Sequence, residues 1–260
     1  LDYWVISDTG SSDNTIQIIE DFFKNKQIPG EIHQAKWRDF AYNRNLALDA
    51  CAGKADYVLF FDADDQVQGH LNLPVLTEDA YYFKMTNEQN SVQYHRLLII
   101  KNNQQYSWKG VIHELIISDQ VTQERVLVGD YIVVSRHLGS RNHNPDKALH
   151  DAQALEAAFL SNAEPEMQSR YAFYCAQSYK AHILQDHQYQ HKALEWYLKR
   201  IEFPHDKNGV DDEKYLSHLY AGYIYEEEGQ FKDAFYHWQC GIELDPMRAE
   251  CWYQIARRHH

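Results

Sequence analysis

One stretch of the chain, VLFFDADD at residues 58–65, limits the folds that are open to the rest. Four consecutive apolar residues indicate a buried strand, because continuously apolar strands are typical of sheets covered on both faces. The strand then runs into three aspartates within four positions. A solvated turn is one interpretation, since aspartate is a common turn residue. The other is a cation site, because Asp62 and Asp64 at i and i+2 of an extended chain point the same way.

Strands and helices alternate over the first 61 residues. The pattern predicts strands at 3–7, 31–35 and 57–61, separated by helices within 11–23 and 38–51. A β-α-β-α-β order favours a parallel sheet, whose ligands bind beyond the carboxyl ends of the strands. Asp8 and Asp62 both lie at such ends.

Composition excludes several classes of protein. The 260 residues carry a net charge of −13, which argues against a broad nucleic-acid surface. No apolar run is long enough to span a membrane. The four cysteines show no C-x-x-C spacing, so we expect reduced thiols and neither a disulfide framework nor a zinc site. These features predict a cytoplasmic protein, which could act at the inner face of a membrane.

The character of the sequence changes twice after residue 80. Strand-like segments rich in Val, Ile and Tyr dominate from about 80 to 135, and everything beyond about 143 is helical. We therefore expect an α/β domain over residues 1–142 and an all-α domain over residues 143–260.

The helical half contains a repeat. The offsets of Gly222, Tyr225, Ala234, Trp238 and Pro246 match the tetratricopeptide pattern. An imperfect earlier copy includes Tyr171, Tyr179, Ala193 and Tyr197, and the segment 203–214 is expected to be an insertion between the copies. Most of these residues should be core stripes of stacked helices. Arrays of this kind bind a protein partner or dock onto a neighbouring domain.

Four segments together resemble a known family: VISDTGSSDNT, NRNLALDACAGKADYVLFFDADD, YHRLLII followed by YSWKGVIHE, and RHLGSRNHNPDK. They are similar to family 2 glycosyltransferases of GT-A fold whose catalytic domain is followed by tetratricopeptide-like helices. Lipopolysaccharide-core glucosyltransferases and bacteriocin peptide glycosyltransferases are similar as well. The resemblance implies a Rossmann-like mixed sheet followed by helical repeats. The family's usual first strand and helix are not found, so we expect a GT-A domain that lacks its first strand.

The resemblance implies a nucleotide-sugar donor, a UDP-sugar, together with Mn²⁺ or Mg²⁺. Each residue expected to hold them also has an ordinary structural interpretation, as a turn residue, a surface ion pair or a histidine bonded to the backbone. The implied roles are base or ribose binding by Asp8, diphosphate binding by Arg44 and Arg141, ribose and cation binding by Asp62 and Asp64, and cation binding by His137.

On the acceptor side the resemblance implies that Glu114, in the segment WKGVIHE, is the general base of an inverting transfer. His113 would orient it or take its place. Trp108 would stack on a sugar ring, or else lie in the core.

These features predict a metal-dependent glycosyltransferase that moves a UDP-hexose sugar, with inversion, onto a glycan, lipid-linked or peptide acceptor. Two alternatives remain open. One is a non-catalytic helical-repeat scaffold with a degenerate GT-A domain. The other is a sugar nucleotidyltransferase, although the Gly-rich basic loop typical of that chemistry is not visible near the first strand.

Overall fold

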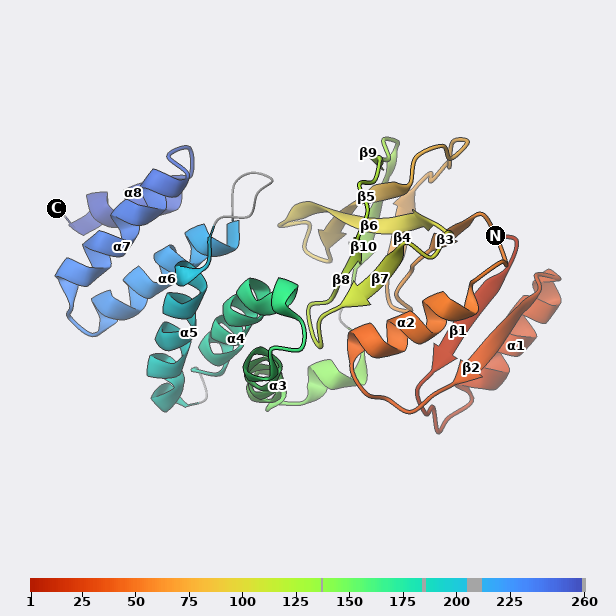
Figure 1. The fold of residues 1–260 in the computed structure, drawn as a ribbon, viewed down its shortest axis with the longest axis horizontal. Coiled ribbons are helices and arrows are strands. Elements are labelled where there is room, and N and C mark those ends of the chain that lie inside the picture. Colours follow the sequence, from red (N-terminus) through yellow and green to blue (C-terminus); the bar gives the residue numbers. More distant parts are fainter. Residues whose placement is uncertain (137, 184–185, 205–211, 259–260) are drawn as a thin grey trace. The chain divides into compact units, whose positions relative to one another are not determined.

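The computed structural model describes residues 1–136, 138–183, 186–204 and 212–258. The chain divides into two compact units, residues 1–143 and 144–260. The first unit combines strands with helices, and the second is helical throughout its described part (Figure 1). The predicted fold class, an α/β domain with a mixed sheet followed by an all-α region, is confirmed.

The chain opens with a β-α-β element made of β1 (Trp4–Asp8), α1 (Thr15–Lys26) and β2 (Gly30–Gln34). The two strands pair in parallel, with Trp4 opposite Gly30. The Trp4 ring stacks on Phe23 of α1 at 4.5 Å between centroids, and its Nε1 donates to the Ile28 carbonyl at 3.0 Å. A Cβ on Gly30 would lie 2.2 Å from the same ring. One tryptophan therefore joins the helix to both strands.

A larger mixed sheet follows, with order β3-β6-β5-β10-β4 and with β9 paired to β5. Its described strands are β3 (Tyr57–Leu59), β4 (Gln66–Gly69), β5 (Ala80–Asn87), β6 (Gln93–Lys101), β9 (Glu124–Val126) and β10 (Tyr131–Ser135). The pairs β5/β10 and β5/β9 are parallel, and the others are antiparallel. Phe83, Met85 and Val133 are fully buried at its centre.

Four further elements belong to the described part of the first unit. The helix α2 (Phe40–Ala50) precedes β3, and β7 (Tyr106–Lys109) and β8 (Leu115–Ser118) form a separate antiparallel hairpin. The 3₁₀ helix η1 (Ser140–His143) lies at the end of the unit. The predicted helix at 38–51 is confirmed, shorter by two residues at its start and by one at its end.

The prediction that residues 58–61 form a strand covered on both faces is wrong. Val58 is 9% exposed, but Leu59 and Phe61 are 39% and 42% exposed. Val58 and Phe60 pack into a small core, so burial alternates along the segment as in a strand covered on one face. β3 lies at the end of the sheet order and pairs antiparallel with β6, not in parallel with β1.

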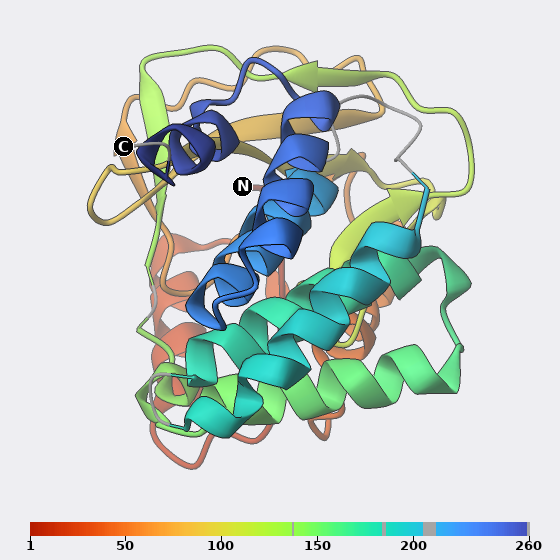
Figure 2. The same cartoon turned by 90° about the vertical axis from the view of Figure 1, so that its left-hand side faces the viewer.

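The second unit is a series of helices in which each main helix contacts the next one in sequence (Figure 2). Its helices are α3 (Lys147–Ser161), η2 (Pro165–Met167), α4 (Gln168–His182), η3 (His187–Tyr189), α5 (Gln190–Glu202), α6 (Asp212–Glu227), α7 (Phe231–Leu244) and α8 (Ala249–Arg258). A Cβ on Gly222 of α6 would lie 2.2 Å from Nε1 of the fully buried Trp238 of α7. The glycine thus lets the two helices approach closely. Residues 205–211 of the expected insertion lie outside the described residues.

Two predictions drawn from composition can be compared with the structure. All four cysteines are free thiols, as expected. Across the described ranges, none of the helices combines the length and the apolar character that crossing a bilayer requires.

Two buried histidines meet between α6 and α7. The Nδ1 atoms of His218 and His237 lie 3.0 Å apart, and the residues are 5% and 6% exposed. One ring must donate and the other accept, so this contact requires at least one neutral imidazole. Tyr225 stacks on His237 at 5.3 Å between centroids. Burial lowers the pKa of His237, against the opposing effect of the Asp233 charge.

This pair should make the helical unit less stable in acid. The pKa of His237 is lower in the folded chain than its ordinary 6.5, so below that pH the unfolded chain binds more protons and is favoured. We expect the free energy of unfolding to fall between pH 7 and about pH 5 by about 1 kcal/mol more in the wild type than in His237→Gln. Urea unfolding followed by far-ultraviolet circular dichroism measures this. The exposed His150 of α3 supplies the control His150→Gln, and identical pH dependence of wild type and His237→Gln would contradict the prediction.

Candidate active site

All the residues predicted to be functional whose positions the structure describes lie in the first unit. Asp8 ends β1, Arg44 lies in α2, Asp62 and Asp64 follow β3, His113 and Glu114 precede β8, and Arg141 lies in η1. His137, the predicted third metal ligand, lies outside the described residues.

Polar side chains determine where α2 begins. Asp39 is the N-cap and accepts a 2.7 Å hydrogen bond from the Tyr42 amide. Asn43 is buried and turns back to the preceding loop, where it accepts from the Arg38 amide at 2.9 Å and donates to the Lys36 carbonyl at 3.2 Å. The loop and the first turn are therefore held as one piece.

Asn45 joins α2 to the edge of β7. Its Nδ2 donates to the Trp108 carbonyl at 2.9 Å, and its Oδ1 accepts from the Trp108 amide at 2.8 Å. The side-chain amide thus takes the place of a neighbouring strand and satisfies both backbone groups of a residue that is 3% exposed.

Arg44 lies between two carboxylates from distant parts of the chain. Its Nε donates to Glu114 Oε1 at 2.7 Å, and its Nη2 donates to Asp62 Oδ1 at 2.7 Å. The guanidinium carbon also lies 4.8 Å from the centroid of the Trp108 ring. The structure therefore brings together three of the predicted residues, Arg44, Asp62 and Glu114.

Trp108 supports this arrangement from the core. Phe60 meets its ring edge to face, with centroids 5.0 Å apart, and only 3% of the residue is exposed. The suggestion that Trp108 stacks on a sugar is therefore wrong, and its core alternative is correct. Its face is occupied by the Arg44 guanidinium, a cation–π contact.

The cluster also contains Arg96, a residue that the sequence did not single out. It extends from β6, and its Nη1 donates to Asp62 Oδ2 at 2.9 Å. Each oxygen of Asp62 is thus bonded to a different guanidinium. Arg96 lies within YHRLLII, but a single arginine in a strand carries no spacing signal that would mark it out.

The electrostatics of the cluster follow from these bonds. Burial alone would raise the pKa of Asp62, but the charges of Arg44 and Arg96 outweigh it and lower that pKa below its ordinary value. Burial likewise acts to lower the pKa of Arg44, and the charges of Asp62 and Glu114 reverse the effect. Asp62 is therefore ionised, and Arg44 is firmly cationic.

Glu114 keeps one carboxylate oxygen available. Its side chain is 10% exposed, and Oε1 is the oxygen held by Arg44. Within the described part of the chain, Oε2 accepts no hydrogen bond. His113, which precedes it, is exposed and has a left-handed φ of 55°, an uncommon conformation for a residue with a Cβ.

The two aspartates after Asp62 have different surroundings. Asp64 Oδ2 accepts from the Leu138 amide at 3.0 Å. Burial, together with the charge of Asp62, raises the pKa of Asp65. The buried oxygens of Asp65 accept no well-formed hydrogen bond from the described residues, and the Ser135 hydroxyl opposes the rise in the pKa of Asp65 without reversing it.

The predicted cation site can be compared with this geometry. Among the residues with described positions, no three His, Cys, Asp or Glu side chains are grouped as a metal site. Asp62 is engaged on both oxygens by guanidinium groups, whereas Asp64 Oδ1 makes no hydrogen bond to these residues. Of these two carboxylates, Asp64 is therefore the one with an oxygen left to bind a hard cation.

Two other predicted residues make contacts of their own. Asp8 is buried, and it accepts hydrogen bonds from the amides of Gly10 and Ser11 in the turn after β1. Bonding to Ser11, reinforced by the Gly10 amide, lowers the pKa of Asp8, so it is ionised. The Arg141 guanidinium lies 5.1 Å from the centroid of the Phe40 ring at the start of α2. No hydrogen bond between described residues joins Asp8 to the Arg44 cluster.

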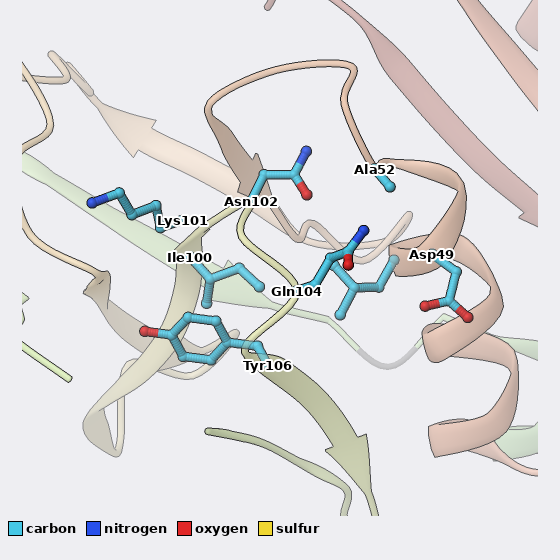
Figure 3. A pocket seen from close by; sticks show the side chains of 8 residues that line it. Asp49, Ala52, Ile100, Lys101, Asn102, Gln104 and Tyr106 are labelled. Carbon is cyan, nitrogen blue, oxygen red and sulfur yellow. The ribbon is translucent and has the colours of Figure 1, made fainter. Parts of the chain in front are cut away.

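A separate pocket of about 290 Å³ lies at the other end of α2 (Figure 3). Its lining combines polar and apolar side chains: Leu48, Asp49, Ala52, Ile100, Lys101, Asn102, Gln104 and Tyr106. Asn102 donates to the carbonyls of Cys51 and Ala55, so it holds the loop after the helix. None of the predicted site residues lines this pocket.

Comparison with known protein families gives a match for the first unit. Residues 3–133, about half of the chain, match the family described as Glycosyl transferase family 2. No curated protein matches the chain. The matched segment contains Arg44, Asp62, Arg96 and Glu114, the members of the cluster described above.

The Asn45 bridge can be tested without an activity assay. Asn45→Ala would leave the amide and carbonyl of Trp108 without partners, which costs about 2 kcal/mol. We expect hydrogen–deuterium exchange in the peptide that contains β7 to be about thirtyfold faster, as measured by mass spectrometry. Asn72→Ala, at an exposed asparagine between β4 and β5, is the control. Equal exchange in the two variants would show that the bridge does not hold β7.

Proposed function

The chain belongs to glycosyl transferase family 2, and from this premise we propose that it transfers a sugar from a nucleoside-diphosphate donor, a UDP-hexose, to an acceptor hydroxyl with inversion. The observation that carries the proposal is the Arg44 bridge. A carboxylate at the end of a strand and a second carboxylate with one available oxygen are held on the same guanidinium, at 2.7 Å each. A family 2 domain supports glycosyltransferase activity in general, and the bridge supports the choice of Glu114 as the base.

Glu114 is the proposed general base. Because Oε1 is held by Arg44, Oε2 can take the proton of the acceptor hydroxyl as that oxygen attacks the anomeric carbon. The new bond joins the acceptor oxygen to the anomeric carbon. The bond from that carbon to the donor phosphate breaks, and its electron pair leaves with the diphosphate. His113 is proposed to orient the acceptor, or to accept the proton in place of Glu114.

The leaving diphosphate requires positive charge. We assign this role to Arg44, whose side chain is 23% exposed, and to Arg141. Family 2 enzymes commonly use nucleotide-sugar donors and divalent cations, and Mn²⁺ or Mg²⁺ is proposed here with Asp64, Asp62 and His137 as ligands. Such an ion would neutralise the charge that develops on the diphosphate.

Asp8 is the proposed contact to the base or ribose of the donor. It lies at the carboxyl end of a parallel strand, where ligands bind in open α/β sheets. Its own turn holds it ionised: Oδ2 accepts from the Gly10 and Ser11 amides, whereas Oδ1 accepts from the Ser11 amide and is the oxygen with more acceptor capacity left. An ionised carboxylate in that position can accept from a ribose hydroxyl or from a base N–H.

The acceptor is proposed to be a glycan, a lipid-linked sugar or a peptide, and the tetratricopeptide-like helices are proposed to help present it or to bind a protein partner. Two aromatic side chains of α8 support a binding role. Trp252 and Tyr253 are 52% and 63% exposed, so their rings are available to contact a ligand or partner.

Removing the proposed base should abolish transfer but keep the fold. Glu114→Gln can still accept from Arg44 through its amide oxygen, but it cannot take a proton. We expect UDP release from a panel of UDP-hexoses to fall by a factor of about 10² to 10⁴, with the affinity for UDP nearly unchanged. Glu124→Gln, at an exposed position of β9, is the control. A Glu114→Gln protein that releases UDP at the wild-type rate would exclude Glu114 as the base.

Removing the proposed cation ligand should act on donor binding. In calorimetry of the full chain with UDP, we expect Mn²⁺ to strengthen binding to the wild type, and we expect this effect to be lost in Asp64→Ala. Asp119→Ala, at an exposed aspartate after β8, is the matched control. Full transfer activity in Asp64→Ala would rule out the cation site. Binding of UDP by the wild type without any turnover would favour the scaffold alternative.

A further inference from the structure

The guanidinium groups around Asp62 have more donors than their protein partners use. Arg96 bonds Asp62 through Nη1, and within the described residues its Nε and Nη2 have no acceptor. Arg44 uses Nε and Nη2, and its Nη1 has none. Since a guanidinium carries five N–H donors in a fixed plane, both groups retain donors directed away from the carboxylate that holds them.

The two groups are both accessible and close to one another. Their side chains are 23% and 28% exposed, and both bond the same carboxylate, at 2.7 and 2.9 Å. Neither guanidinium can lose a proton and so reduce its number of donors, because arginine stays charged in proteins. The chemical complement of two adjacent guanidinium groups is an anion with several oxygens, and a diphosphate offers these on two linked phosphorus atoms.

We propose that Arg96, together with Arg44, forms an anion subsite that binds the diphosphate of the donor. This inference rests on the proposed function and deepens it, because it gives a role to an arginine on β6 that the sequence did not mark. In this arrangement the role of Asp62 is to hold both guanidinium groups in position through its two carboxylate oxygens. The subsite supplies a part of donor affinity that does not depend on a cation.

A direct contact and a positioning role predict different results. If Arg96 touches the diphosphate, Arg96→Ala weakens UDP and leaves uridine unaffected, since uridine has no phosphate. If Arg96 only holds Asp62, which the family resemblance implies binds ribose as well as the cation, then in the absence of Mn²⁺ the affinities for UDP and uridine fall together. The ratio of the two affinities therefore separates the two roles.

The experiment uses the full chain and three probes: UDP, uridine and inorganic diphosphate. Calorimetry with and without Mn²⁺ measures UDP and diphosphate, and ligand-observed nuclear magnetic resonance measures uridine. We expect Arg96→Ala to bind UDP and diphosphate ten- to a hundredfold more weakly, the loss of one charge-assisted contact, with uridine unchanged. Arg96→Lys, which keeps the charge with fewer donors, should recover part of the affinity.

Arg125→Ala, at an exposed arginine of β9, is the matched control and should behave as the wild type does. Thermal unfolding followed by circular dichroism establishes that each variant is folded. If Arg96→Ala did not fold, the same comparison with Arg96→Lys would decide. Unchanged UDP affinity in a folded variant, or equal losses for UDP and uridine, would overturn the inference.

Failure of the inference and failure of the proposed function give different results. A wild type that releases UDP from a UDP-hexose, with an Arg96→Ala variant that binds UDP normally, overturns the subsite alone. Binding of diphosphate that depends on Arg96, without any binding of UDP or uridine, supports the subsite and overturns the uridine nucleotide as donor. A wild type that binds neither diphosphate nor UDP overturns both.

Discussion

The Arg44 guanidinium is the interaction on which the rest of the candidate site depends. It joins Asp62 and Glu114, which are 18 and 70 positions away in the chain. The desolvation of partly buried charges offsets much of their attraction, so these pairs are not a large source of stability. Their effect is geometric. A planar guanidinium fork fixes the directions of both carboxylates, which a flexible ammonium could not do.

Three consecutive residues of α2 make this arrangement possible. Asn43 faces the loop before the helix, Arg44 faces the carboxylates, and Asn45 faces the edge of β7. Successive helical side chains are separated by about 100° around the axis, so three neighbours can make contacts in three directions. The Asn45 bridge fixes the backbone of Trp108, and the Trp108 ring in turn lies against Arg44. The helix, the hairpin and the charged cluster therefore form one connected structure.

Local patterns in the sequence predicted much of this unit. The β1, α1 and β2 segments and the helix α2 follow from apolar periodicity and caps, which depend on neighbours in the chain. The spacing of Asp62 and Asp64 and a family resemblance together point to Asp62, Arg44 and Glu114, and in the structure both carboxylates are hydrogen bonded to Arg44. Their mutual distances could not be predicted, because they depend on how β3, α2 and the β7/β8 hairpin pack.

The predictions that were wrong or missing also concern features that depend on how distant segments pack. The exposure of Leu59 and Phe61 reflects the position of β3 at the end of the sheet order, which an apolar run does not reveal. The role of Arg96 depends on the antiparallel pairing of β6 with β3, the strand that Asp62 follows. Nothing in the local sequence distinguishes it from a surface arginine.

Because the chain as a whole is negatively charged, the directions of the hydrogen-bond donors in this cluster matter more for anion binding than the net charge of the cluster does. At −13, the protein as a whole repels an anionic nucleotide. At physiological salt, charges separated by more than about 8 Å are largely screened, so short-range contacts decide binding. The charges of the two guanidinium groups and the two carboxylates in the cluster cancel. Asp62, however, accepts a hydrogen bond from only one nitrogen of each arginine. The remaining donors are fixed in direction by the carboxylate that neutralises them. An anion can therefore be recognised by oriented hydrogen bonds at a place where the summed charge is close to zero, and Asp62 contributes by orienting its two arginines.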